Sequence, residues 1–529
     1  MRNSTGGTMG WLVRGEWRRA ALWALWIALA GLAVPADAEV RGTRDEFKVY
    51  VAGDAGDAVP GDGYCETAVG NSVCTLRAAI QEANAYPGAD MVSIMTTEPI
   101  TLTSGHGLLI SDDLVVRSGH SGMALISGQP AGPNPIFVIS GSAYPDVELI
   151  DLDLRNALSG EVGAVVWVES GGDLTITGCQ LRSNTSLLGG AVGIDGESGN
   201  VLIENSAFID NPDPAYGGSI GVLNNRGGAI YISGTPNPNN QRGSVSIRGS
   251  TFNFNRAIRG GGAIAIVNTY WDLGVEDTSF LVNGINDGSV ANGGAVEIVS
   301  SSNPSLRVAA RLERCSLFYN EAPDGLGGAI AATDANLRLV NCTLGVNEAA
   351  VGGAVWVDGG RIALSQTTLK DNDADIAGGG LYADVGTAVL VSAAVLDANL
   401  PVNCSSAVQL EGGHSLSSDD SCGFLGAGNL SSTPAGLGPA TGGAGGLISY
   451  PPAPGSPALD SAGEGPCLDA FGAIVDDDQN GGLRPADGDG DGLVRCDRGA
   501  HEVPAQVEPP LFADDFETGN LSGWSSVLP

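Results

Sequence analysis

The middle of the chain consists of short stretches in which apolar and polar residues alternate. Three clear examples lie at 229–233, 245–248 and 354–358. Alternation with a period of two is typical of β-strands that bury one face. The helical period does not run through any stretch of about twelve residues in this region. The pattern therefore predicts many short strands rather than helices.

Two short motifs recur in step between residues 179 and 384. In the first, an apolar residue precedes an asparagine by three positions, at Asn184, Asn211, Asn255, Asn283, Asn320, Asn347 and Asn372. In the second, two glycines precede Ala or Leu and a larger apolar residue, beginning at Gly189, Gly227, Gly261, Gly293, Gly327, Gly352 and Gly379. The asparagines are 27, 44, 28, 37, 27 and 25 residues apart. A unit of 25 to 28 residues, lengthened by surface insertions such as 236–241 and 300–305, explains these spacings.

A repeat of this length that holds two or three short strands predicts one coil of a parallel β-helix, in which each coil bonds only to its neighbours. Glycine suits the corners, since a sharp turn needs a positive φ. Asparagine tolerates the left-handed region, and equivalent asparagines on stacked coils can hydrogen-bond as a ladder. We therefore expect an all-β protein, a right-handed single-stranded parallel β-helix over residues 91–399.

The paired Gly-Gly-Ala-Ile/Val and Phe/Leu-x-x-Asn motifs resemble the repeats of the polymorphic outer-membrane proteins, which are surface adhesins built as β-helices. Residues 62–65 and 74–84 resemble the signature of the CSLREA-type bacterial β-helix family, with Thr75 in place of Ser and Ala78 in place of Glu. Segments 403–404, 413–416, 454–460 and 484–502 resemble the choice-of-anchor Q module that follows such β-helices, with His501 where an aromatic residue is usual. The resemblances imply an exported bacterial surface protein.

Both ends of a coil stack expose apolar core and unpaired strand edges, so we expect caps. Segment 74–84 places Leu76, Ala79, Ile80 and Ala83 on one helical face, which predicts a short helix in an N-terminal cap over 39–90. Pro, Gly and Ser become frequent after residue 399. We expect an irregular, disulfide-bonded module over 400–503, followed by a linker and short tail over 504–529.

The charge of the chain excludes two classes of partner. The 529 residues carry 25 Lys+Arg against 60 Asp+Glu, a net charge of −35. Nucleic acids and anionic membranes bind basic surfaces, so neither is an expected partner. Glycine supplies 80 positions without the strict period of collagen, which agrees with many tight corners.

Residues 1–38 have the pattern of a secretory signal. Arginines precede an apolar run at 20–34, and residues 36–38 read Ala-Asp-Ala, a small-x-small cleavage site. The apolar run is shorter than the roughly 20 residues that span a bilayer. We expect the mature chain to start at Glu39, without a transmembrane segment, and to be secreted or held at the cell surface or outer membrane.

Nine cysteines in an exported chain suggest disulfides. Three pairs lie close enough in sequence to close short loops, although other pairings stay open: Cys65/Cys74, Cys404/Cys422 and Cys467/Cys496. Cys179, Cys315 and Cys342 each precede a repeat asparagine by five residues. We expect these three to be small buried core residues.

Alternating Asp and Gly at 487–492 indicates a cation site, because several carboxylate oxygens can converge on one hard ion there. Position twelve of an EF-hand loop should be Glu, but Arg498 stands there, and Asp497 is the nearest substitute. We expect Asp487, Asp489, Asp491 and Asp497 to bind a structural calcium ion. A solvated acidic turn is the alternative.

Catalytic patterns lack their required context. The string Gly-Gly-Ser-Ile-Gly at 217–221 lies among Gly-rich strands, not at the strand-to-helix turn of a hydrolase. Residues 105–107, Gly-His-Gly, are a tripeptide of β-helical polygalacturonases, but the Arg-x-Lys that follows it in that family is absent. The four histidines are too far apart in sequence to form a metal motif.

These patterns favour contact over turnover. We expect an exported, non-catalytic protein that acts in adhesion or as a structural scaffold, with a surface glycan or protein as ligand. The alternative is a polysaccharide lyase or glycoside hydrolase, because many β-helices act on glycans. A lyase acting on uronates needs a basic residue beside calcium carboxylates, and the repeat region offers Arg256, Arg259, Arg311, Arg314 and Arg338.

Overall fold

The computed structural model describes residues 45–128, 132–142, 144–160, 162–197, 199–212, 226–234, 241–267, 270–285, 290–405, 411–443 and 446–505. The predicted signal, the 217–221 string and the tail from residue 506 lie outside these described residues. Within them, no helix combines the length and the apolar character that crossing a bilayer requires.

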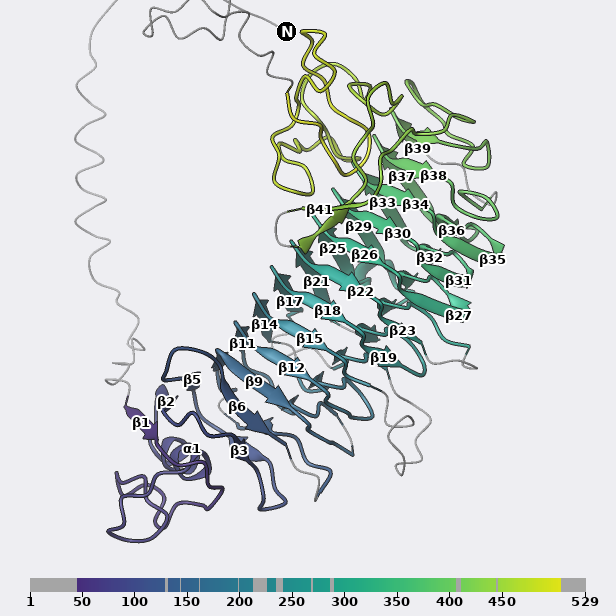
Figure 1. Ribbon diagram of the computed structural model, residues 1–529. Coiled ribbons are helices and arrows are strands. Elements are labelled where there is room, and N and C mark those ends of the chain that lie inside the picture. Colours follow the sequence, from purple (N-terminus) through teal and green to yellow (C-terminus); the bar gives the residue numbers. More distant parts are fainter. Residues whose placement is uncertain are drawn as a thin grey trace, which may run out of the picture. The chain divides into compact units, whose positions relative to one another are not determined.

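The described residues form four parallel sheets that run along a stack of coils, which confirms the predicted parallel β-helix (Figure 1). Sheet 1 has thirteen strands: β1 (Glu46–Val49), β2 (Asp90–Ile94), β5 (Leu114–Ser118), β8 (Val147–Ile150), β11 (Leu174–Thr177), β14 (Asn200–Glu204), β17 (Gly243–Arg248), β21 (Trp271–Glu276), β25 (Ala309–Glu313), β29 (Asn336–Val340), β33 (Arg361–Ser365), β37 (Ala388–Ser392) and β39 (Glu411–Gly413). Neighbours in this list are hydrogen-bonded, so each coil adds one strand to the sheet.

Sheet 2 follows sheet 1 in each coil. Its twelve strands are β3 (Ile100–Thr101), β6 (Ala124–Ser127), β9 (Leu152–Arg155), β12 (Gln180–Arg182), β15 (Ala207–Ile209), β18 (Thr251–Asn253), β22 (Ser279–Leu281), β26 (Ser316–Phe318), β30 (Thr343–Gly345), β34 (Thr368–Lys370), β38 (Val395–Asp397) and β40 (Leu416–Ser417). The inward side chains of this sheet stack in register. The rings of Phe208, Phe252 and Phe280, for example, lie 4.7 and 5.0 Å apart between centroids.

Sheets 3 and 4 complete the coils. Sheet 3 has ten strands: β4 (Leu108–Ile110), β7 (Phe137–Ile139), β10 (Val166–Val168), β13 (Val192–Ile194), β16 (Ile230–Ile232), β20 (Ile264–Val267), β24 (Val296–Val299), β28 (Ile330–Thr333), β32 (Val355–Asp358) and β36 (Leu381–Ala383). Sheet 4 has five: β19 (Arg256–Ala257), β23 (Gly284–Ile285), β27 (Glu321–Leu326), β31 (Glu348–Val351) and β35 (Asp373–Ala377). Other elements are the 3₁₀ turn η1 (Pro304–Leu306) and the antiparallel pair β41 (Thr441–Gly442) and β42 (Ile448–Ser449).

The helix predicted near the N-terminus is α1 (Leu76–Ala85). The Thr75 side chain accepts the Ala78 N–H and caps its first turn. The four predicted apolar positions join the main core cluster. Glu82 is fully buried, and its two oxygens accept the N–H groups of Gly61 and Gly63 at 2.7 and 2.6 Å. The helix therefore both covers core and holds the preceding loop, and β1 joins sheet 1 just before that loop.

Each repeat coil turns at three left-handed residues, of which one is a glycine just before sheet 3, as at Gly327 with a φ of 68°. Another lies between sheets 1 and 2, as at Asn205 with a φ of 50°. The third immediately precedes each repeat asparagine: Ser183, Asp210, Phe254, Val282, Tyr319, Val346 and Asp371. The left-handed residue at this corner is thus the one before the asparagine, and even β-branched Val282 adopts it.

The repeat asparagines form one buried row along the stack. Asn283 is typical: its backbone N–H and its Nδ2 donate to Asn320 Oδ1 at 3.1 and 3.0 Å, and Nδ2 also donates to the carbonyl of Phe252 at 2.8 Å. The same bonds continue to Asn399 and Asn403, and every member is at most 3% exposed. The side chain of Asn283 therefore satisfies two backbone groups of the preceding coil and also bonds to the asparagine side chain of the next coil.

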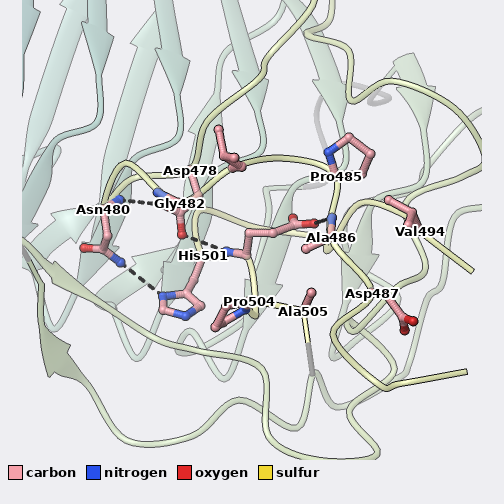
Figure 2. A pocket seen from close by; sticks show the side chains of 12 residues that line it. Asp478, Asn480, Gly482, Pro485, Ala486, Asp487, Val494, His501, Pro504 and Ala505 are labelled. Atoms are coloured by element: carbon pink, nitrogen blue, oxygen red, sulfur yellow. Dashed lines mark hydrogen bonds between the residues drawn. The ribbon is translucent and has the colours of Figure 1, made fainter. Parts of the chain in front are cut away.

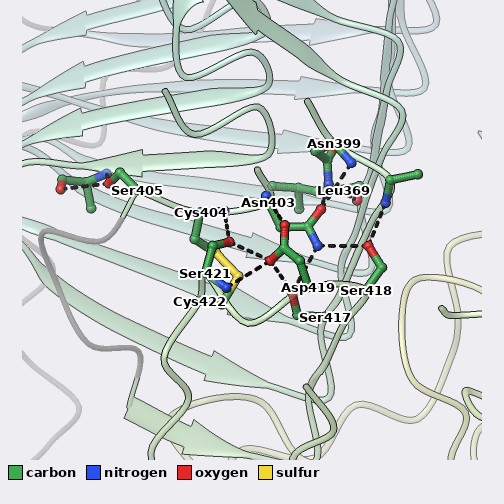
Figure 3. The surroundings of a disulfide bond; sticks show 12 residues. Leu369, Asn399, Asn403, Cys404, Ser405, Ser417, Ser418, Asp419, Ser421 and Cys422 are labelled. Carbon is green, nitrogen blue, oxygen red and sulfur yellow. Dashed lines mark hydrogen bonds between the residues drawn. A yellow bond between two sulfur atoms is a disulfide. The ribbon is translucent and has the colours of Figure 1, made fainter. Parts of the chain in front are cut away.

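The row ends on hydroxyl groups beside a disulfide (Figure 3). The last amide, Asn403 Nδ2, donates to Ser417 Oγ and Ser418 Oγ, each at 2.9 Å. Its backbone N–H donates to Asp419 Oδ2 at 2.8 Å. Cys404 next to it is bonded to Cys422. The last coil therefore leaves no ladder amide without an acceptor.

Candidate functional site

Two of the four predicted calcium ligands lie together with a third carboxylate that the sequence pattern missed. Among the described residues, the group that could hold a metal ion is Asp460, Asp487 and Asp489, with one carboxylate oxygen of each within 4.8 Å of the others. Asp460 is 27 residues before the loop in sequence. It ends the 454–460 segment that resembles the anchor module, but no spacing rule connects it to the loop.

The other two predicted ligands point elsewhere. Asp491 Oδ2 lies 3.3 Å from Arg495 Nη1 on the surface. Asp497 is 1% exposed, and its two oxygens accept the backbone N–H groups of Asp460 and Val503, both at 2.7 Å. Burial raises the pKa of Asp497 to about 6. Asp497 therefore holds the backbone around the cluster rather than a shared ion.

Three disulfides are present, and they join the cysteines that lie close in sequence: Cys65–Cys74, Cys404–Cys422 and Cys467–Cys496. The remaining thiols, Cys179, Cys315 and Cys342, are fully buried in the main core cluster. Burial raises the pKa of Cys179 to about 12. A thiol with so high a pKa is a poor nucleophile, which agrees with a packing role.

The C-terminal module contains an open pocket of about 610 Å³, lined by residues of 478–487, 494 and 501–505 (Figure 2). His501 Nδ1 lies 3.2 Å from Ser449 Oγ and 3.1 Å from Asn480 Nδ2. Asp478 is not a triad partner, because its oxygens accept the backbone N–H groups of Asn480, Gly482 and Glu502. Ser449 is 0% exposed. The group is thus a hydrogen-bonded network in which Ser449 is buried and Asn480 and His501 line the pocket.

The module packs through ion pairs on Arg338 of sheet 1 and on Arg314, which directly follows β25 of that sheet. Arg314 Nη1 lies 3.1 Å from Asp477 Oδ2, and the same guanidinium pairs with Glu276 and Asp277. These carboxylates raise the pKa of Arg314 above its usual value. Arg338 pairs with Asp469 and lies over the ring of Phe471, 4.2 Å from its centroid. Both guanidinium groups are therefore engaged in contacts with the C-terminal module.

The outer face of sheet 3 carries a row of apolar and aromatic side chains. The row follows the strand register through Leu109, Val138, Trp167, Gly193, Tyr231, Ala265, Glu297, Ala331, Trp356 and Tyr382. None belongs to the main core cluster, whereas most of their strand neighbours do. The alternation of a strand therefore turns this row outward. Trp356 and Tyr382 are adjacent in register and half-buried.

Glu297 is the one charged member of this outer row. It is 2% exposed, and its Oε2 lies 2.5 Å from Arg226 Nη1. Burial raises the pKa of Glu297 to about 7, against the opposing effect of Arg226. The folded state thus holds a proton on Glu297 more tightly than the unfolded chain does.

This raised pKa predicts a pH-dependent effect of Glu297→Gln. The contribution of the carboxyl to stability is full below about pH 4.5 and is lost as the pH rises toward 7, because the unfolded chain ionises first. Relative to wild type, the variant should gain about 3 kcal/mol in free energy of unfolding over this interval. Urea unfolding of both proteins at several pH values measures the difference. A difference that does not vary with pH contradicts the prediction.

Comparison with known proteins finds no matching family model, no matching curated protein and no matching solved structure.

Proposed function

We propose that this chain is an exported, non-catalytic contact protein that binds a neutral glycan at a cell surface through Trp356 and Tyr382, at the C-terminal end of the outer row of sheet 3. The observation that carries the proposal is the pair of half-buried rings on adjacent coils, Trp356 and Tyr382. Adjacent strands lie about 4.8 Å apart, and the face of an aromatic ring is a surface on which the C–H groups of a sugar can stack.

Two carboxylates lie close to these rings in sequence, and they are suitable hydrogen-bond acceptors for the hydroxyl groups of a sugar. Asp358 lies two residues after Trp356 on the same strand, and Asp384 lies two residues after Tyr382. Burial and the charges of Asp384 and Asp334 raise the pKa of Asp358. Carboxylate oxygens accept hydrogen bonds from sugar hydroxyls. The net charge of −35 opposes acidic glycans, which favours a neutral ligand.

Export is supported by the three disulfides and by the signal-like N-terminus. The resemblances to CSLREA-type β-helices, to polymorphic outer-membrane protein repeats and to the choice-of-anchor Q module point to the same place, the bacterial surface. A scaffold role agrees with the engaged arginines, since a catalytic face needs groups free to reach substrate.

The test is binding to a panel of insoluble neutral polysaccharides by the chain that starts at Glu39. The double variant Trp356→Ala/Tyr382→Ala should lower affinity by at least about tenfold, since each ring contact contributes about 1 kcal/mol. Tyr319→Ala is the matched control, because that exposed ring lies outside the row. Equal binding by the double variant and wild type would overturn the proposed surface. Release of reducing ends or unsaturated products would instead assign the enzymatic alternative, a polysaccharide lyase or glycoside hydrolase.

A further inference from the structure

The acidic loop and Asp460 form one cluster of carboxylates in the C-terminal module. One oxygen from each of Asp460, Asp487 and Asp489 lies within 4.8 Å of the other two. Ionised carboxylates at this separation repel one another, and either a proton or a bound cation relieves the repulsion. The carboxylate of Asp487 points away from His501, so the cluster is distinct from the histidine network (Figure 2).

A second observation at the cluster points to a ligand. Asp460 is only 6% exposed. Its Oδ2 accepts the backbone N–H of Asp489 at 2.8 Å, whereas its Oδ1 is buried and has no hydrogen-bond partner. A buried acceptor without a partner costs about 1–3 kcal/mol. A cation bound to this oxygen removes that cost.

The loop is held in place before any ion binds. Asp487 Oδ1 and Oδ2 accept the N–H groups of Gly490 and Gly492 at 2.8 and 3.0 Å. A Cβ added at Gly488 would lie 2.9 Å from Leu459 Cδ1 and 3.0 Å from Val503 Cβ, so only glycine fits there without a shift. The close packing of Gly488 sets its two flanking carboxylates beside Asp460.

We propose that Asp460, Asp487 and Asp489 bind one calcium ion. All three ligands are oxygens, which favours a hard cation over zinc. A glycine-rich loop adapts to the irregular six- to eight-fold coordination of calcium, whereas magnesium requires a near-ideal octahedron and keeps most of its waters. The ligand set differs from the one that loop spacing alone predicts, since Asp460 replaces Asp491 and Asp497.

The ion fastens the loop to the segment that packs on the last coils. Two residues before Asp460, Ala458 is buried against Val395 of β38 and Leu416 of β40. Ser456 Oγ donates to the carbonyl of Ala435 at 2.5 Å. Calcium would thereby stiffen the connection between the module and the end of the stack. This inference is independent of the proposed glycan surface.

The test is equilibrium dialysis of radioactive calcium against the chain that starts at Glu39, with thermal unfolding measured in calcium and in chelator. Wild type should bind one ion more tightly than the rest of its acidic surface binds calcium. Asp460→Asn should weaken this site by about tenfold or more and abolish the calcium-dependent rise in unfolding temperature. Asp489→Asn, at an exposed position, should do the same without disturbing buried packing.

Asp491→Asn is the matched control. It removes the same charge from the same loop but lies outside the cluster, so it should bind calcium as wild type does. Equal losses in Asp491→Asn and Asp489→Asn would show general attraction to an acidic loop and overturn the site. Displacement of calcium by an equal concentration of magnesium would overturn the choice of ion. Absence of tight binding in wild type would overturn the proposal as a whole.

Discussion

Replacing Asn320 with alanine should lower the free energy of unfolding by about 5 kcal/mol, because it leaves several buried polar groups without partners. Asn320 Oδ1 accepts both the N–H and the Nδ2 of Asn283, and its Nδ2 donates to Asn347 Oδ1 and to the carbonyl of Phe280. Asn320 is 0% exposed, so water cannot replace these bonds without opening the stack. Urea unfolding followed by far-UV circular dichroism measures the loss.

Asn336→Ala is the control for this experiment. Asn336 begins β29, is half-buried and lies outside the ladder, so its truncation should cost less than about 1 kcal/mol. The comparison separates the ladder from the general effect of removing an amide side chain. Similar losses at the two positions would mean that the ladder bonds contribute little beyond ordinary surface asparagines.

The ladder shows what periodicity can predict. The seven asparagines found from the spacing all lie in it, because a constant distance from an apolar inward residue fixes the position within a coil. Asn399 follows Leu396 by the same three residues and extends the row. Asn403 does not fit, since it comes only four residues later and enters the row from the closing turn. Its place in the row depends on how the last coil is closed, and the repeat pattern contains no information about that closing turn.

The left-handed corners of the coils could not be predicted from the side chains that occupy them. Ser183, Phe254 and Val282 share a left-handed backbone but no side-chain chemistry, so only the coil geometry imposes it. Because residues 378–380 are all glycine, the sequence alone does not show which of them occupies the corner. Hydrogen bonds between coils assign Gly378 to the corner, although the motif as written begins at Gly379.

Sequence spacing also could not predict that Asp460 lies beside the acidic loop. Loop periodicity relates residues within a few positions, and Asp460 reaches the loop only because the 454–460 segment folds back beside it. The two carboxylates that spacing placed in the site are used otherwise, one in a surface ion pair and one on backbone amides. Tertiary contacts, and not the local pattern, decide which aspartates converge.

Gly327→Ala should lower the free energy of unfolding by about 4 kcal/mol or detach the coils that follow it. Gly327 has a φ of 68°, and an added Cβ would lie 2.1 Å from the carbonyl oxygen of Ile330. That oxygen belongs to the backbone of β28, so it cannot move without breaking the register of sheet 3. The cost therefore combines an unfavourable φ with a steric clash. Urea unfolding and limited proteolysis at the corner measure it.

Two other glycines separate these contributions. Gly386 has a φ of 96° with no atom within 4 Å of an added Cβ, so Gly386→Ala should show the backbone cost alone, about 1 kcal/mol. Gly274 lies on β21 with no positive φ, and its nearest atom is 3.9 Å away, so Gly274→Ala should be neutral or slightly stabilising. The order of losses should be Gly327, Gly386, Gly274. If Gly327→Ala costs no more than Gly386→Ala, glycine is needed at Gly327 for its backbone angle and not to avoid the clash with the carbonyl oxygen of Ile330.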